Sequence, residues 1–280
     1  MSTFKLETLK QKLIAILAAS FLFRIVMFFI LPDSPSPLGP DEGTYAALVE
    51  WTAESKPVDK FPAFGAGLYL SSRSFILPAS AFCRLGFDSL EAVRLTASLY
   101  GFLTLTIVFS LILTLVKINF NLKTISKHNE VVIVLLFGVF AFLPSHFIWS
   151  NIGLRESPNE FWVLVVMISL FAIYDLERRY LIVAIFILFV STVLTFSTRP
   201  QTGWLIGLSC LVYSITKFKR IETPFVIAIV LLGVIAGTAG TAGTAGTAGT
   251  AGTAGTAGTC LLYTSPSPRD RTRSRMPSSA

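Results

Sequence analysis

Two adjacent carboxylates, Asp41 and Glu42, have the type and position for acid–base chemistry. They lie in the segment Gly39-Pro40-Asp41-Glu42-Gly43-Thr44-Tyr45, ten residues after an apolar run that ends at residue 31. A carboxylate within hydrogen-bond reach of a hydroxyl group can remove its proton as a general base. The pair therefore indicates a reaction at a membrane surface, with Asp41 as the candidate base and Glu42 as a second catalytic carboxylate.

Apolar helices must hold this pair in place. Hydrophobic residues make up 53% of the 280-residue chain and charged residues 14%. Several apolar runs approach the roughly 20 residues that cross a bilayer core. We predict an all-α, polytopic integral membrane protein with six transmembrane helices and a shortened seventh. The predicted spans are residues 13–31, 97–116, 131–149, 161–174, 180–196, 204–216 and, shortened, 224–235.

Lysines and arginines gather in alternate connections between these spans. They precede the first span and fill the second, fourth and sixth connections, whereas the short connections on the other side carry only Arg155 and Arg199. The positive-inside rule then predicts a cytoplasmic N-terminus and an extracytoplasmic loop of residues 32–96. The N-terminal apolar run is longer than a signal-peptide core and lacks a cleavage motif, so we predict a retained anchor.

The outer loop contains two predicted short helices. The first, residues 42–53, has one face that comprises Tyr45, Leu48, Val49 and Thr52. The second, residues 74–83, is apolar and bracketed by Arg73 and Arg84. It is too short to span a bilayer. We therefore predict an interfacial or re-entrant helix.

Asp41 also has a purely structural interpretation. Aspartate is a preferred N-cap residue, and Pro40 can end the preceding extended segment. Glu42 would then lie in the first helical turn, where the helix dipole favours an acidic residue. The residues alone leave the catalytic and capping interpretations open.

The arrangement resembles that of the GT-C glycosyltransferases, in the branch that contains protein O-mannosyltransferases and lipid A aminoarabinose transferases. The resemblance rests on an N-in first span, a long outer loop with Asp41-Glu42-Gly43-Thr44-Tyr45 near its start, and a second interfacial helix. The stretch Ala92-Val93-Arg94-Leu95, which leads into the second span, completes it. The resemblance covers residues 10–235, and its weight comes from the place of the Asp-Glu pair relative to the spans.

The resemblance implies a fold and an activity. Such enzymes take a sugar from a polyprenyl-phosphate carrier, invert its anomeric centre and act at the outer face of a prokaryotic plasma membrane. The acceptor is a glycan, lipid or protein hydroxyl. Their essential acidic residue is in the first extracytoplasmic loop, where Asp41 lies. Glu42 would orient the acceptor, assist Asp41 or turn to solvent, and Tyr45 would contact substrate. Because family members are longer, this chain is expected to be truncated.

Positive charge is needed to hold the departing lipid phosphate. Arg199 is the first candidate, because its planar guanidinium suits a phosphate in a low-dielectric setting. Arg155 and Arg94 are the other candidates, and Glu156 is a further substrate-binding candidate. Each arginine has an alternative role as an interface anchor whose head group reaches water.

Three other polar residues have structural interpretations. Arg24 lies near the middle of the first span and is predicted to face the bundle interior, where it meets a partner or lines a lipid-carrier groove. Glu160 is predicted to close a capping box that begins at Ser157. His146 is interpreted as a hydrogen-bonded interfacial residue, with substrate contact as the alternative.

The cofactor stays unknown. A hard cation such as Mg²⁺ or Mn²⁺ suits carboxylate oxygens, but two carboxylates without further ligands assign no metal site. The three cysteines lie far apart and have no metal-ligand spacing.

The C-terminal part is predicted to have a different origin. Residues 236–259 repeat Ala-Gly-Thr without variation, and residues 260–270 and 274–280 match a translated sequencing-library adapter. We therefore divide the chain into a membrane domain (1–235), a low-complexity repeat (236–259) and an adapter-derived tail (260–280). The four arginines and one aspartate of the tail supply three of the seven net positive charges. The basic balance therefore does not indicate a nucleic-acid partner.

Two other classes of membrane protein stay open. An O-antigen polymerase or ligase has its functional residues in later outer loops, which fits Arg155 and Arg199 but not the early carboxylate pair. A transporter or flippase would carry polar residues or helix breaks near mid-membrane in paired halves. Arg24 and the short spans point that way. A truncated product without activity is the third possibility.

Overall fold

The computed structural model describes residues 3–4, 6–30, 37–39, 41–61, 65–119, 125–175, 181–216, 224 and 226–236. By its internal contacts the chain divides into two units, Met1–Thr241 and Ala242–Ala280, and every described residue belongs to the first. From residue 237 on, the predicted repeat and tail lie outside the described residues.

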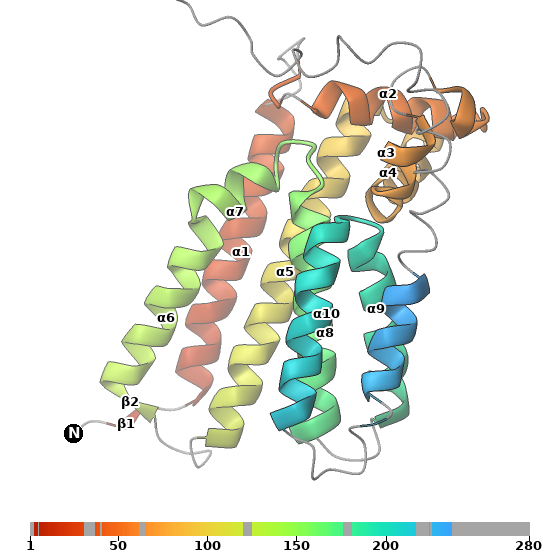
Figure 1. Cartoon of the computed structure of the whole chain (residues 1–280). Coiled ribbons are helices and arrows are strands. Elements are labelled where there is room, and N and C mark those ends of the chain that lie inside the picture. The colour runs from red at the N-terminus through yellow and green to blue at the C-terminus, as the bar shows by residue number, and fades with distance from the viewer. Residues whose placement is uncertain are drawn as a thin grey trace, which may run out of the picture. The chain divides into compact units, whose positions relative to one another are not determined.

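The first unit is a bundle of apolar helices (Figure 1). The central helix α5 (Ser89–Asn119) contacts α1 (Leu6–Ile30) on one side and α8 (Glu156–Asp175) on the other. Helix α9 (Leu181–Phe196) packs against α8, and α10 (Pro200–Thr216) packs against α9. Residues 226–236 are also helical. Many large apolar side chains point outward, including Phe29, which is 71% exposed, and Ile182, which is 81% exposed. Such a surface suits lipid rather than water.

Three of the described helices are long and apolar enough to cross a membrane. They are Glu7–Ile30, Ser89–Lys117 and Glu156–Tyr174. The predicted helical fold is confirmed, but the predicted six or seven spans are not. The third predicted span is divided into α6 (Lys127–Phe142) and α7 (Pro144–Trp149). Pro144 lacks a backbone N–H and disfavours a helical conformation in the residue before it. Leu143 is accordingly extended, with φ −57° and ψ 125°.

The later helices are shorter than a bilayer core. In the described part α9 has 16 residues and α10 has 17. At a rise of about 1.5 Å per residue they extend roughly 25 Å, against the roughly 30 Å of hydrocarbon. The sequence predicted these spans from their apolar character alone. Helices α9 and α10 are as apolar as the three long helices but have fewer described helical residues.

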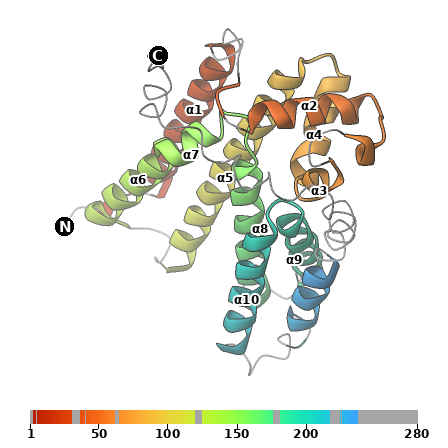
Figure 2. The same ribbon diagram turned by 45° about the horizontal axis from the view of Figure 1, so that its top comes forward.

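A cap of short helices covers the N-terminal end of α5 (Figures 1 and 2). It consists of α2 (Glu42–Ala53), a 3-10 helix η2 (Val58–Lys60), α3 (Gly65–Leu70) and α4 (Arg73–Arg84). The two helices predicted in the outer loop are thus confirmed. The four predicted face residues of α2 are buried and pack against α4 and α5, with Phe75 and Ile76 of α4 at the centre of this small core.

The opposite end of the bundle joins the start of the chain to the α5–α6 connection. Strand β1 (Thr3–Phe4) pairs antiparallel with β2 (Ile125–Ser126). The Lys12 ammonium lies 2.7 Å from the buried Glu130 carboxylate, and Ser126 caps α6 by accepting a hydrogen bond from the Asn129 N–H. Two of the segments grouped on one side by the sequence, the start of the chain and the α5–α6 connection, therefore meet in space.

Candidate functional site

Glu42 is the most firmly held carboxylate of the cap. Its side chain is completely buried, and so is the guanidinium of Arg94. Arg94 Nε donates to Glu42 Oε1 at 2.8 Å and Arg94 Nη2 donates to Oε2 at 3.3 Å. The backbone N–H of Gly153 donates to Oε1 at 3.0 Å, and that of Leu38 donates to Oε2 at 2.7 Å. The carboxylate thus links α2, α5, the residues before α2 and the turn before α8.

These contacts fix the charge state of Glu42. Burial by itself raises the pKa of the carboxyl group. The guanidinium of Arg94 and the two backbone N–H groups lower it by more, and the pKa lies below its ordinary value of 4.5. Of the three roles predicted for Glu42, the turn to solvent is therefore wrong. Catalytic assistance by Glu42 and phosphate binding by Arg94 stay predictions, but the two side chains already bind each other.

Asp41 has the opposite environment, although it is the preceding residue. It is exposed and occupies the N-cap position of α2, yet its side chain makes no capping hydrogen bond. Only its backbone carbonyl takes part in the helix start, accepting from the Tyr45 N–H at 3.0 Å. Within the described part of the chain its carboxylate has no hydrogen bond or ion pair. The capping interpretation thus lacks its hydrogen bond, and the carboxylate is open to a ligand.

Tyr45 brings the predicted site residues into one neighbourhood. The ring is 2% exposed and meets Phe75 edge-on, with ring centroids 5.5 Å apart. Burial raises the pKa of the phenol, the positive charge of Arg155 lowers it, and the negative charges of Asp41 and Glu156 raise it further. These three charged groups therefore all lie near enough to the buried hydroxyl to affect it electrostatically, a proximity that the sequence left open.

Arg199 pairs with Glu156 beside this cluster. Arg199 lies between α9 and α10, and Glu156 is the first residue of α8. The two side chains are 37% and 29% exposed. Arg199 Nε and Glu156 Oε2 are buried atoms without a hydrogen-bond partner among the described residues. The neighbouring Thr198 hydroxyl contacts the hydroxyl of Ser74, which connects this turn to α4.

The predicted capping box at the start of α8 is wrong. The helix begins at Glu156 rather than after Ser157, and the Ser157 hydroxyl donates to the Trp149 carbonyl at 3.3 Å. The Glu160 carboxylate instead lies 2.7 Å from His146 Nδ1. His146 is 2% exposed and stacks on Phe140, which confirms its interpretation as a hydrogen-bonded residue.

Arg24 faces the bundle interior, as predicted. It is 2% exposed, donates to Ser20 and to Ser150 Oγ, and lies over the Phe147 ring at 5.1 Å from its centroid. Because α1 ends at Ile30, Arg24 is about 9 Å from the end of the helix at a rise of about 1.5 Å per residue. It is therefore closer to the cap than the sequence indicated.

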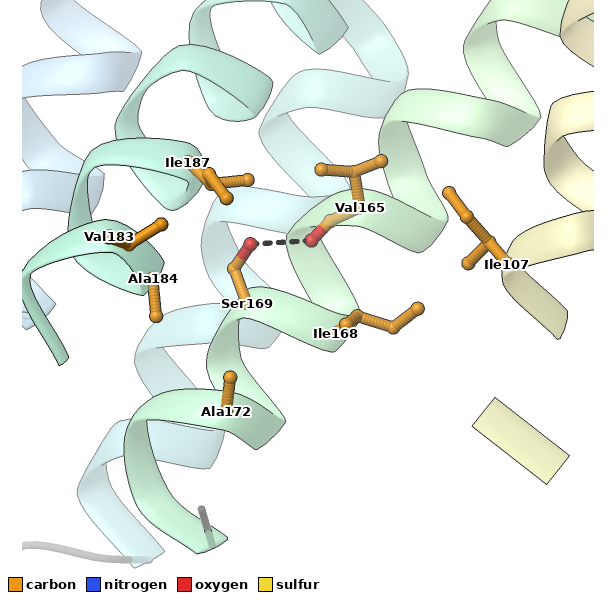
Figure 3. A pocket seen from close by; sticks show the side chains of 8 residues that line it. All are labelled: Ile107, Val165, Ile168, Ser169, Ala172, Val183, Ala184 and Ile187. Atoms are coloured by element: carbon orange, nitrogen blue, oxygen red, sulfur yellow. Dashed lines mark hydrogen bonds between the residues drawn. The ribbon is translucent and has the colours of Figure 1, made fainter. Parts of the chain in front are cut away.

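The groove shown in Figure 3 is unsuited to catalysis. It has a volume of about 400 Å³ and lies between α5, α8 and α9. The Ser169 hydroxyl is its only lining side chain with a hydrogen-bonding group, and that hydroxyl donates to the Val165 carbonyl of its own helix at 2.7 Å. In the described ranges no group of three or more His, Cys, Asp or Glu side chains could hold a metal ion.

One contributor to the site was missed in the sequence. Gly153 donates to Glu42, and a Cβ at this position would lie 2.2 Å from Val93 Cγ1, so the close approach requires glycine. Comparison of the chain with protein-family models, curated proteins and solved structures gave no match.

Proposed function

We propose that residues 1–235 form part of an inverting membrane glycosyltransferase that uses a polyprenyl-phosphate sugar donor and a glycan, lipid or protein hydroxyl as acceptor. The observation that carries the proposal is the exposed carboxylate of Asp41, which has no partner among the described residues and lies in the same neighbourhood as Arg155, Glu156 and Arg199. The long apolar helices support a place in a membrane. A base and cations in one cluster are what transfer from a phosphate leaving group requires.

In the proposed reaction the acceptor hydroxyl gives its proton to the Asp41 carboxylate. The acceptor oxygen forms a bond to the anomeric carbon while the bond from that carbon to the phosphate oxygen breaks, on the opposite face of the sugar. The lipid phosphate leaves with the electron pair, and Arg155 and Arg199 stabilise its charge. Glu42 and Arg94 act as positioning residues, because they fix the start of α2 and hence Asp41.

The proposed topology has six spans and a shortened seventh in a prokaryotic plasma membrane, with a cytoplasmic N-terminus and an extracytoplasmic site. The pairing of β1 with β2 supports it, since this contact brings the N-terminal lysines to the α5–α6 connection. In Figure 1 the strands β1 and β2 are at the other end of the bundle from the cap. Positive residues gathered at one end fit the cytoplasmic side.

The test is sugar transfer from polyprenyl-phosphate donors in membranes that contain this protein. We expect Asp41→Asn to lower turnover by about 10²- to 10⁴-fold, the usual contribution of a general base, while donor binding is retained. Glu54→Gln is the matched control, because Glu54 is a half-exposed carboxylate of the same loop whose partner is Lys56. Undiminished transfer by Asp41→Asn would contradict the assignment of the base.

One observation favours the polymerase or ligase class as the second candidate. The half-exposed pair of Arg199 and Glu156 joins the turn between α9 and α10 to the start of α8, the region where that class is expected to carry its functional residues. Loss of activity in Arg199→Gln together with full activity in Asp41→Asn, measured on preassembled lipid-linked glycans, would select this candidate over the first.

A further inference from the structure

The arginines in and around the cap differ in whether they have partners among the described residues. Arg84 donates to the carbonyls of Ala53 and Thr52, Arg94 binds Glu42, and Arg199 binds Glu156. Arg73, the first residue of α4, makes no ion pair or hydrogen bond through its side chain with any described residue. A cation without a protein partner in a largely apolar setting is a candidate for binding an anion.

Arg73 lies at a cleft between four helices. The cleft has a volume of about 470 Å³ and is formed by α4, α5, α8 and the end of α9. This volume is in the range of small-molecule sites, about 300–1,000 Å³. Arg73 is the only charged residue of the lining, and the apolar wall comprises Leu77, Pro78, Trp162, Val193 and Leu194.

Two hydroxyl groups of the cleft lining have hydrogen bonds within the protein. The Tyr100 hydroxyl donates to the Ser74 carbonyl at 2.8 Å, and the Ser197 hydroxyl donates to the Leu194 carbonyl at 2.9 Å. Ser197 precedes Arg199 by two residues, and the hydroxyl of Ser74 contacts that of Thr198. Because Arg73 precedes Ser74 and Arg199 follows Thr198, this contact links the neighbourhood of Arg73 to that of the Arg199–Glu156 pair.

We propose that this cleft binds a single-chain amphiphile, with its anionic head at Arg73 and its apolar chain against Leu77, Val193 and Leu194. Charge complementarity selects an anionic head, because Arg73 has no acidic partner in the described part of the chain. The inference rests on the proposed function for the role of this ligand, which would be the lipid-phosphate donor. Binding itself requires no transfer, so the two proposals can fail separately.

The cleft contains its own spectroscopic probe, Trp162. In the full chain with Trp51, Trp149 and Trp204 replaced by phenylalanine, Trp162 is the sole tryptophan. The chain is placed in phosphatidylcholine nanodiscs and titrated with a bromine-labelled dodecyl phosphate, and quenching of Trp162 fluorescence is measured. We expect saturable quenching by the phosphate and weak, non-saturating quenching by the bromine-labelled alcohol of the same length.

Substitutions then test the assignment of the head group. Arg73→Gln should weaken the apparent affinity by about tenfold or more, as expected for a lost charge-assisted hydrogen bond. Arg73→Lys should restore part of it, and Leu194→Phe, which fills the cleft, should lower the quenching at saturation. Lys60→Gln, which removes an exposed cation of the same loop, is the matched control and should bind normally. Thermal unfolding of each variant checks that the fold is intact.

Four results would overturn the proposal. They are equal quenching by the alcohol, normal affinity in Arg73→Gln, displacement of the probe by inorganic phosphate at equal concentration, and tighter binding of a brominated two-chain phosphatidylglycerol. The Asp41→Asn variant separates the two proposals. Normal binding by this variant together with lost transfer supports both, whereas saturable binding in a wild-type chain that transfers no sugar supports the cleft and contradicts the proposed function.

Discussion

Two glutamate–arginine pairs of this protein look alike in sequence and differ in environment. Glu42 begins α2 and Glu156 begins α8, and each binds an arginine from a distant segment. The side chains of the first pair are 0% and 1% exposed, whereas those of the second are 29% and 37% exposed. The backbone N–H groups of Leu38 and Gly153 donate further hydrogen bonds to the Glu42 carboxylate. In contrast, Glu156 Oε2 has no hydrogen-bond partner among the described residues.

This difference separates a structural role from a role in binding. Breaking a buried pair leaves a lone charge away from water, which is costly, whereas a half-exposed pair contributes little because water replaces the missing partner. The second pair can therefore exchange its partner for a ligand at small cost. Glutamate and arginine thus stabilise the fold at Glu42 and Arg94, whereas the same residue types are accessible to a ligand at Glu156 and Arg199.

The largest expected effect comes from neutralising the buried carboxylate. Glu42→Gln keeps the side-chain size but leaves Arg94 charged and buried, so the free energy of unfolding should fall by about 3–5 kcal/mol. Denaturant unfolding in mixed micelles measures this change. A loss no greater than that of the Glu156→Gln variant would remove the distinction between the two pairs.

The second expected effect comes from adding a methyl group at Gly153, whose N–H approaches Glu42 closely. A Cβ in Gly153→Ala would lie 2.2 Å from Val93 Cγ1 and 3.2 Å from Glu42 Oε1, so the turn must shift. We expect a loss of about 1–3 kcal/mol in the free energy of unfolding, the usual cost of overpacking. Gly67→Ala is the control, because its Cβ would have no neighbour within 4 Å. Equal stability of the two alanine variants would contradict the close packing at Gly153.

Acid should weaken the buried pair. The pKa of Glu42 in the folded protein is below its ordinary value of 4.5, despite burial, because Arg94 and the N–H groups favour the carboxylate. The stabilisation is therefore complete above pH 4.5 and is lost as the pH falls below 4.5 through the folded-state pKa. The gap in unfolding free energy between wild type and Glu42→Gln, followed against pH, should narrow in acid. A gap that stays constant would contradict this assignment.

The smallest expected effect is that of the half-exposed pair. Glu156→Gln should change the free energy of unfolding by about 0–1 kcal/mol, since the pair is partly hydrated and screened by salt. The same unfolding measurement at low and high salt checks it. A loss approaching that of Glu42→Gln would show that Glu156 also holds the fold, and would weaken its proposed role near the substrate.

Local patterns in the sequence predicted the short helices well. The spacing of Tyr45, Leu48, Val49 and Thr52 predicted the buried face of α2, and the two flanking arginines predicted α4 with its bounds. Both are properties of neighbouring residues, which helical periodicity determines directly. Counting the connections placed Asp41, Arg155 and Glu156 on the same side of the bundle but did not predict that they lie near one another.

Long-range contacts were beyond such patterns. Nothing near Glu42 in the sequence indicates that it is buried, because Arg94 and Gly153 come from other elements. The capping box at Ser157 failed for a related reason, since Glu160 finds a better partner in His146 of the preceding helix. The break at Pro144 was visible as a residue but was hidden inside an apolar run that the hydropathy pattern treats as continuous.

The three partners of Glu42 are synthesised at different times. They lie 4, 52 and 111 residues along the chain from the carboxylate. During synthesis Leu38 is present from the start, Arg94 follows with the beginning of α5, and Gly153 arrives only after α7. The entrance to the early loop is thus fixed by a residue made much later, and contacts of such long sequence separation form slowly. We therefore expect the Glu42 carboxylate to gain its full set of partners only after the segment that contains Gly153 has been made.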